Sequence, residues 1–130
     1  MTPELSILAA LAVITLILPV VYSALFSKQV GQAVLSSNRE NAPEPTGAAG
    51  RLKRAHANLI ENLVPFAAVV LVAHAAGVSN TITIAGAWIF LAARLTHIAV
   101  YFAGITGIRT VAYFVSLLGS FMIASQIWLG

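Results

Sequence analysis

The chain passes from polar to apolar sequence without a break through Arg54-Ala55-His56-Ala57-Asn58-Leu59-Ile60-Glu61-Asn62-Leu63-Val64-Pro65. Apolar residues then continue as far as Ala76. Because a helix needs about 20 residues to cross the hydrocarbon core of a bilayer, a span that ends at Ala76 has to begin near Ala57. Asn58 and Glu61 therefore fall inside the predicted span. A carboxylate at that depth is costly and marks a candidate functional site.

The composition is that of an integral membrane protein. Of the 130 residues, 59% are hydrophobic, and only seven are Lys or Arg and four Asp or Glu. Charged residues make up roughly a quarter of a soluble domain, so this chain lies far outside the soluble range. The three longest stretches without Asp, Glu, Lys or Arg are Leu5–Ser27, Asn62–Ala93 and Thr110–Gly130.

The same composition excludes two classes of function. The net charge of +3 is small and concentrated in one connection, so there is no soluble basic surface to hold a nucleic acid. The chain contains no cysteine, so it forms no disulfide and supplies no thiol as a nucleophile or metal ligand. Any thiol chemistry therefore needs a thiol from a bound small molecule.

The first apolar run follows Met1-Thr2-Pro3-Glu4, which is acidic where a signal peptide is basic, and the run is too long for a signal sequence. Thr2 as the N-cap, Pro3 at the first helical position and Glu4 in the first turn predict an ordinary helix start. We therefore expect the first apolar run to be a membrane span.

We predict an all-α integral membrane protein with a single domain over residues 1–130. Its four spans are expected at Pro3–Ser27, Gly50–Ala76, Thr81–Ala103 and Ile108–Leu129. The short connections after the second and third spans force antiparallel neighbours, so the expected architecture is an up-down four-helix bundle. The one long connection, residues 28–49, is polar and rich in Pro and Gly, which predicts a flexible loop.

The distribution of basic residues predicts the orientation of the bundle. Six of the seven lie in or beside the two connections on one face of the membrane: Lys28, Arg39, Arg51, Lys53, Arg54 and Arg109. By the positive-inside rule this face is cytoplasmic, which puts both termini outside. The compact loops and the absence of a targeting segment favour a bacterial inner membrane.

Polar residues recur at helical spacing on two of the predicted spans. Residues three or four positions apart share one face of a helix. On the second span these residues are Arg54, Asn58, Glu61 and Pro65, and on the third they are Arg94, His97 and Tyr101.

Two of these residues carry opposite charge at similar depth. With a rise of about 1.5 Å per residue, Glu61 lies about 10 Å and Arg94 about 12–13 Å in from the basic side. Pairing would lower the cost of burying each charge, so we predict an ion pair between Arg94 and Glu61. Pro65 cannot bond to the carbonyl of Glu61 and is expected to kink the helix there.

Two interpretations of this polar material remain open. A buried Arg–Glu pair can simply fix the register of neighbouring helices. Register needs only one pair, however, whereas many donors with few acids are typical of a site for an anionic ligand. The three histidines have no spacing typical of metal ligands, so we predict no metal site. His56 is out of phase with its polar neighbours and His74 is isolated, so we expect both to be interfacial.

The two polar motifs resemble a known family. The pattern Arg54-Ala55-His56-x-Asn58-x-x-Glu61-x-x-x-Pro65-Phe66 is similar to the signature of the membrane-associated proteins in eicosanoid and glutathione metabolism (the MAPEG family). The pattern Arg94-x-x-His97-x-x-x-Tyr101, followed by Arg109-Thr110-Val111-Ala112-Tyr113, resembles the microsomal prostaglandin E synthase and microsomal glutathione transferase branch. The resemblance covers about residues 50–130 and consists of two motifs on separate helices in the expected order.

The resemblance implies a homotrimer that binds glutathione, as cosubstrate, between neighbouring subunits near the cytoplasmic side. It implies that Arg109 and Thr110 face the thiol and are catalytic, and that Arg94 is the structural partner of Glu61. The implied glutathione-binding residues are Arg51, Arg54, Asn58, Glu61, His97, Tyr101 and Tyr113. The implied enzyme is a glutathione transferase or peroxidase, and its second substrate is a lipophilic electrophile from the bilayer. Arginine beside the thiol would lower the pKa of that thiol and so activate the nucleophile.

Two other functions remain as alternatives. Ala57 and Leu59 stand where the prostaglandin synthase branch has a base and an acid, which would suit a non-catalytic relative that binds lipid or acts as a scaffold. A small multidrug transporter also has four helices in a short chain. Such transporters depend on an unpaired carboxylate in the first helix, and the apolar run of the first helix here contains none.

Overall fold

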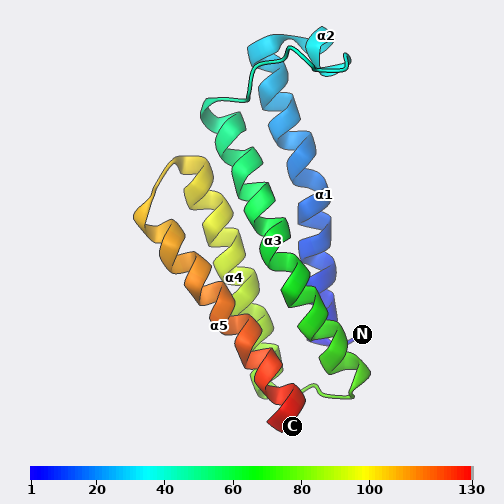
Figure 1. The fold of residues 1–130 in the computed structure, drawn as a ribbon. Coiled ribbons are helices and arrows are strands. Elements are labelled where there is room, and N and C mark those ends of the chain that lie inside the picture. The colour runs from blue at the N-terminus through cyan, green and yellow to red at the C-terminus, as the bar shows by residue number, and fades with distance from the viewer. Residues whose placement is uncertain (130) are drawn as a thin grey trace.

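The computed structural model describes residues 1–129, and every regular element among them is a helix. The elements are α1 (Pro3–Val30), α2 (Gln32–Leu35), α3 (Gly47–Ala75), α4 (Thr81–Ala103) and α5 (Gly107–Leu129) (Figure 1). Helices α1, α3, α4 and α5 are long and apolar enough to cross a membrane. The prediction of an all-α protein with four membrane spans is thereby confirmed.

The helix ends differ slightly from those expected. Helix α1 continues to Val30 rather than ending at Ser27, and α3 begins at Gly47 rather than Gly50. The long connection also contains the four-residue helix α2, which the sequence did not predict. Both helices therefore extend further toward the polar connection than their apolar runs do.

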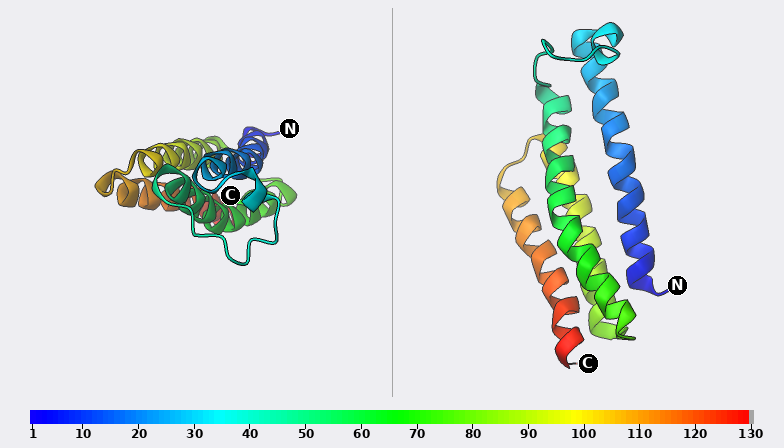
Figure 2. Two further views of the ribbon diagram at one scale, coloured as in Figure 1. Left: turned by 90° about the horizontal axis from the view of Figure 1, so that it is seen from above. Right: turned by 45° about the vertical axis from the view of Figure 1, so that its right-hand side comes forward.

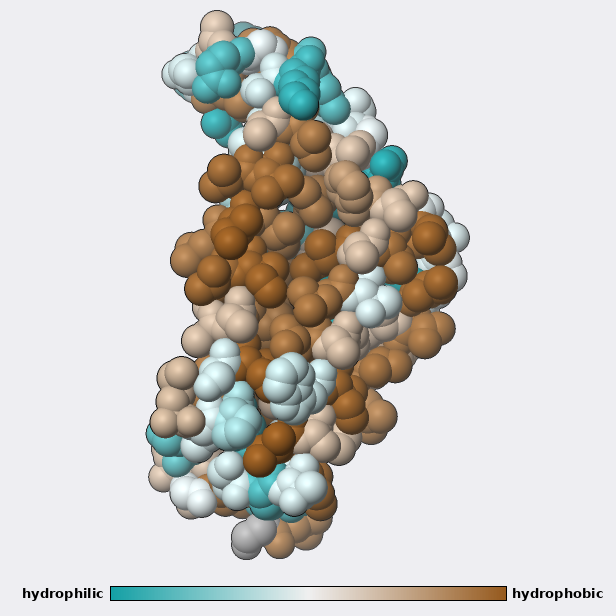
Figure 3. Space-filling model, turned by 180° about the vertical axis from the view of Figure 1, so that it is seen from behind, coloured by the Kyte–Doolittle hydropathy of each residue, from teal (hydrophilic) through white to brown (hydrophobic). Residues whose placement is uncertain are grey.

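The four long helices run up and down, with α2 and the long connection at one end and both termini at the other (Figures 1 and 2). Hydrophobic side chains cover the middle of the face seen in Figure 3, and polar side chains gather at its two ends. An apolar belt between polar ends is the surface expected of a protein that crosses a bilayer.

Helices α4 and α5 approach each other most closely at a pair of glycines. A Cβ atom added to Gly119 would lie 2.5 Å from the carbonyl oxygen of Gly86, and one added to Gly86 would lie 2.6 Å from that of Gly119. Small residues let helix backbones meet in this way, and this packing drives helix association in lipid. Helix α3 joins the pair through Phe66, whose ring stacks on that of Phe90 with 3.8 Å between centroids.

Polar contacts hold α1 at both of its ends. The side chain of Glu4 is only 4% exposed, and it accepts hydrogen bonds from the hydroxyls of Ser79 and Thr83. At the other end, the amide of Gln29 donates to the backbone carbonyl of Thr46 over 3.0 Å. The helix start predicted from the sequence is present, but the tie between Glu4 and the turn before α4 was not foreseen.

The glycine contact generates a test of stability. We expect Gly119→Ala to lower the free energy of unfolding by about 1–3 kcal/mol, because the new methyl group meets backbone atoms that cannot rotate away. Gly107→Ala is the matched control, since a Cβ atom there meets nothing within 4 Å. The measurement is unfolding by SDS titration in mixed micelles, and equal midpoints for the two variants would contradict this account of the α4–α5 contact.

Candidate functional site

A polar pocket of about 230 Å³ opens between α3, α4 and α5 near the basic end of the bundle. All of its lining residues belong to the set that the sequence singled out: Asn58, His97, Tyr101, Arg109, Thr110 and Tyr113. They come from three helices that are far apart in sequence. The structure therefore brings together most of the residues that the two motifs predicted as a site.

Arg109 and Thr110 bring positive charge and hydrogen-bond donors to this pocket from the first turn of α5. The guanidinium of Arg109 lies 4.4 Å from the centre of the Tyr101 ring, which is the geometry of a cation–π contact. The first turn of a helix also presents unpaired backbone N–H groups and the positive end of the helix dipole. The α5 side of the pocket is therefore suited to an anion.

Beneath the pocket lies a fully buried guanidinium. Arg94 is 0% exposed, and its Nη2 donates to Oδ1 of Asn58 over 2.6 Å. Its Nη1 donates to the hydroxyl of Ser116 over 3.3 Å, and that hydroxyl donates to the carbonyl oxygen of Tyr113 over 2.7 Å. These bonds join α3, α4 and α5 directly behind the pocket wall.

The predicted ion pair between Arg94 and Glu61 is wrong for the single chain. Glu61 is exposed, and the ion pair found within residues 1–129 joins Lys53 to Glu44 instead. Comparing depths along two helices gives the height of each group but not its direction around the helix axis. Asn58, one turn before Glu61, points at Arg94, while Glu61 lies on the outer face of α3.

The two remaining predicted ligands lie outside the polar pocket. Nε of Arg51 donates to the carbonyl oxygen of Phe102 over 2.9 Å, at the end of α4. Arg54 is exposed and lines a separate hollow of about 350 Å³, together with Lys53 and Ala57. Arg54 and Glu61 thus share an uncovered polar face of α3, away from the pocket.

Two residues of the site were missed at the sequence level. Ser116 was not among the predicted site residues, although it lies one turn after Tyr113 and so on the same face of α5. Asn62 was not among the predicted site residues either, although it is buried and the adjacent Glu61 is exposed. Its amide donates to the backbone carbonyl of Asn58 over 2.8 Å. The sequence signal that could have identified Asn62 is an amide side chain within an apolar span.

Three buried nitrogens lack a hydrogen-bond partner among residues 1–129: Nε2 of His56, Nε of Arg94 and Nδ1 of His97. Buried polar atoms without partners are destabilising, and two of these three atoms belong to the pocket or to the network behind it. His56 contacts α1, with its ring centroid 5.8 Å from that of Tyr22. Within residues 1–129 no group of three His, Cys, Asp or Glu residues is placed to hold a metal ion.

Comparison with known proteins gives one match. A model of the MAPEG family matches residues 5–129, which is nearly the whole chain. No curated protein and no solved structure matches the chain.

The network behind the pocket can be tested through Ser116. We expect Ser116→Ala to lower the free energy of unfolding by about 1–2 kcal/mol, because it removes an acceptor from a buried guanidinium. Ser120→Ala is the matched control: it lies one turn further along α5, and its hydroxyl donates only to the backbone carbonyl of Ser116. SDS titration of both variants is the measurement. An equal, small effect of the two changes would mean that Ser116 does not support Arg94.

Proposed function

The chain belongs to the MAPEG family, and from this premise we propose that it is a membrane glutathione transferase. In this proposal it conjugates lipophilic electrophiles with glutathione, or reduces lipophilic hydroperoxides at the expense of glutathione. The observation that carries the proposal is the polar pocket, in which Arg109, Thr110, Tyr113, His97, Tyr101 and Asn58 converge near the basic end of the bundle.

The chemistry of the pocket fits that of glutathione. Glutathione has two carboxylates, one amine and one thiol, so its site needs several cationic or hydrogen-bond donors and one acid. Arg109, the hydroxyls of Thr110 and Tyr113 and the start of α5 supply donors. Glu61, on the neighbouring face of α3, is the acid that would meet the amine.

Asn58 has its orientation set by the buried network. Because Oδ1 of Asn58 accepts from Arg94, its amide nitrogen is the group left to donate to a ligand carboxylate. Arg94 is thus a positioning residue in this proposal: it touches Asn58 rather than the ligand. The proposed role replaces the ion pair with Glu61 that the sequence suggested.

The proposed reaction needs a thiolate, which Arg109 and Thr110 would stabilise. A guanidinium beside the sulfur lowers the pKa of the glutathione thiol, and a hydroxyl can donate a hydrogen bond to the same sulfur. In conjugation the thiolate attacks the electrophilic carbon, a C–S bond forms, the leaving group departs with its electron pair, and the thiol proton passes to water. The lipophilic partner would enter from the bilayer, which accounts for a membrane location.

The uncovered face of α3 supports a proposed homotrimer. Arg54 and Glu61 are exposed on a helix that is apolar enough to span the membrane, and a carboxylate facing lipid is costly. The pocket volume of about 230 Å³ also falls below the ≈ 300–1,000 Å³ of typical ligand sites. A neighbouring subunit placed on this face would cover the charges and complete the site.

The mechanism is tested at Arg109. We expect Arg109→Ala to lower kcat/KM for conjugation by about 10²–10³, because the positive group that stabilises the developing charge is lost. Thiolate formation, followed by ultraviolet absorbance on adding glutathione, should fall in parallel while the oligomer stays intact. Arg39→Ala is the matched control, because the guanidinium of Arg39 bonds only to the carbonyl of Leu35 in its own connection. Unchanged conjugation by Arg109→Ala would refute the mechanism.

Glutathione binding separates the enzyme from a non-catalytic relative. Calorimetry on the detergent-purified protein should show binding, and Glu61→Gln should weaken it about tenfold or more through the lost charge-assisted bond to the amine. Native mass spectrometry of the same samples reports the oligomer. If the unaltered protein binds no glutathione at millimolar concentration, the polar network is structural and the non-catalytic alternative holds.

A further inference from the structure

The short turn that joins α4 to α5, residues 104–106, sets the position of the start of α5. Tyr101 lies in the last turn of α4 and Arg109 in the first turn of α5, and their cation–π contact of 4.4 Å spans the connection. Both side chains line the polar pocket. A displacement of the α4–α5 turn would therefore move two of the groups that face the proposed ligand.

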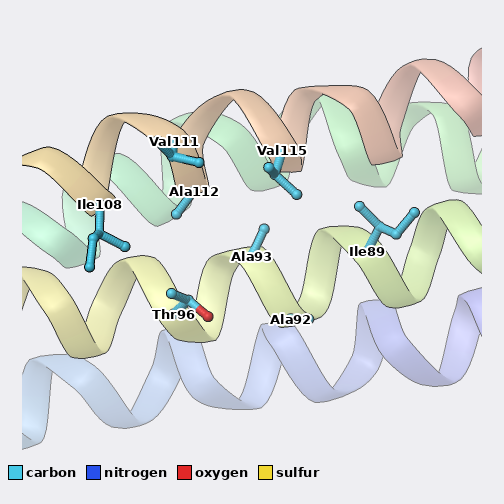
Figure 4. A pocket seen from close by; sticks show the side chains of 8 residues that line it. All are labelled: Ile89, Ala92, Ala93, Thr96, Ile108, Val111, Ala112 and Val115. Carbon is cyan, nitrogen blue, oxygen red and sulfur yellow. The ribbon is translucent and has the colours of Figure 1, made fainter.

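Packing between the two helices does not by itself fix this turn. The backbones of α4 and α5 meet at Gly86 and Gly119, and the helices diverge from there toward the turn (Figures 1 and 2). An apolar opening of about 330 Å³ lies between them beyond the glycine contact, and Figure 4 shows the side chains that line this space. Two helices that stand apart at one end need another contact to hold that end in place.

The contact that holds the turn comes from Arg51 on α3. Its Nε donates to the carbonyl oxygen of Phe102 over 2.9 Å. A Cβ atom added to Gly104 would lie 3.7 Å from this Nε and 3.8 Å from Cδ and Cζ of the same side chain, so Arg51 lies along the turn. Within residues 1–129 this is the one side-chain hydrogen bond that reaches residues 101–108.

Arg51 also supplies what the end of α4 requires. The last four carbonyls of a helix have no partner within it. In α4 the amides of Gly104 and Ile105 donate to two of these carbonyls, while that of Phe102 accepts from Arg51. The C-terminal end of a helix also favours a positive charge, and the last turn of α4 contains no basic residue of its own. A cation from α3 therefore joins that helix to the turn.

We propose that Arg51 is a positioning residue for the transferase: by fixing the α4–α5 turn it places Arg109 beside the thiol of bound glutathione. This inference rests on the proposed glutathione chemistry. The family resemblance implied instead that Arg51 binds glutathione, yet Arg51 is not among the residues that line the polar pocket, and its Nε is used at the end of α4. A misplacement of about 1 Å can cost 10²-fold in rate, so holding Arg109 in place has a measurable consequence.

The first arm of the experiment tests the hold on the turn without glutathione. Arg51→Met keeps an unbranched stem and removes the guanidinium. We expect the amides of Gly104 and Ile105 to exchange hydrogen about tenfold faster, as measured by mass spectrometry on the detergent-purified protein. Lys53→Met is the matched control on the same helix, because Lys53 pairs with Glu44 of the long connection rather than with the turn. Equal exchange in the two variants would overturn the proposal.

The second arm tests what the turn does for the thiol. Thiolate absorbance is followed against pH on adding glutathione, and calorimetry measures binding of S-hexylglutathione, which has no free thiol. A cation beside a thiol favours the thiolate, so we expect Arg51→Met to raise the midpoint of thiolate formation by about one pH unit. S-hexylglutathione should bind within about threefold of its affinity for the unaltered protein. An unshifted midpoint would overturn the proposal, and so would a loss of S-hexylglutathione affinity of about tenfold or more, which would make Arg51 a ligand.

Two further outcomes are decided by the same arms. If Arg51→Met does not assemble, Arg51→Gln, which keeps a polar side chain but removes the charge and Nε, takes its place with the same expected changes. If the unaltered protein binds no glutathione, the proposed transferase fails, and the exchange arm alone decides whether Arg51 holds the turn.

Discussion

A buried guanidinium is the constraint on which this bundle depends. Arg94 is sealed from solvent on α4, and without its partners an unpaired charge would lie inside a membrane protein at a cost of several kcal/mol. Its hydrogen bonds to Asn58 and Ser116 reach the two neighbouring helices, so satisfying one side chain fixes how three helices face one another. Apolar packing cannot do this alone, because lipid tails are as apolar as a leucine side chain and pack against one about as well as another leucine does.

The glycine contact between α4 and α5 adds a second constraint with a different consequence. Because the backbones touch at Gly86 and Gly119, the helices act as a wedge that is closed at one end and open toward the basic end. Arg109, Thr110 and Tyr113 of α5 line the polar pocket, and Val111, Ala112 and Val115 line a separate apolar opening between α4 and α5. A single crossing point thus leaves a polar environment and an apolar one within a few residues of the same helix start, as the proposed reaction between a thiolate and a lipophilic molecule would require.

The fold was largely predictable from the sequence, because bilayer thickness limits the length of each span and glycine or polar breaks separate them. Part of the pocket was predictable too: Asn58, His97 and Tyr101 belong to polar patterns at helical spacing, and the family resemblance implied Arg109, Thr110 and Tyr113 near the start of α5. The pairing within the site was not. Glu61 and Asn58 differ by one turn, and only the rotation of α3 against α4 decides which of them reaches Arg94. That rotation comes from tertiary packing such as the stacked rings of Phe66 and Phe90. The spacing of residues along one helix does not reveal this packing.

The mistaken ion pair is itself informative about assembly. If Glu61 formed an ion pair with Arg94 inside the chain, α3 would expose no unpaired carboxylate at membrane depth. A single copy would then avoid the cost of a carboxylate that faces lipid. Because Arg94 donates from both terminal nitrogens to neutral amide and hydroxyl oxygens instead, Glu61 stays on the outer face beside Arg54. A carboxylate in that position needs a cation or a donor from outside the chain. The same exchange of partners that lets Asn58 and Ser116 accept from Arg94 within the single bundle leaves the carboxylate on its α3 face without a partner of its own among residues 1–129.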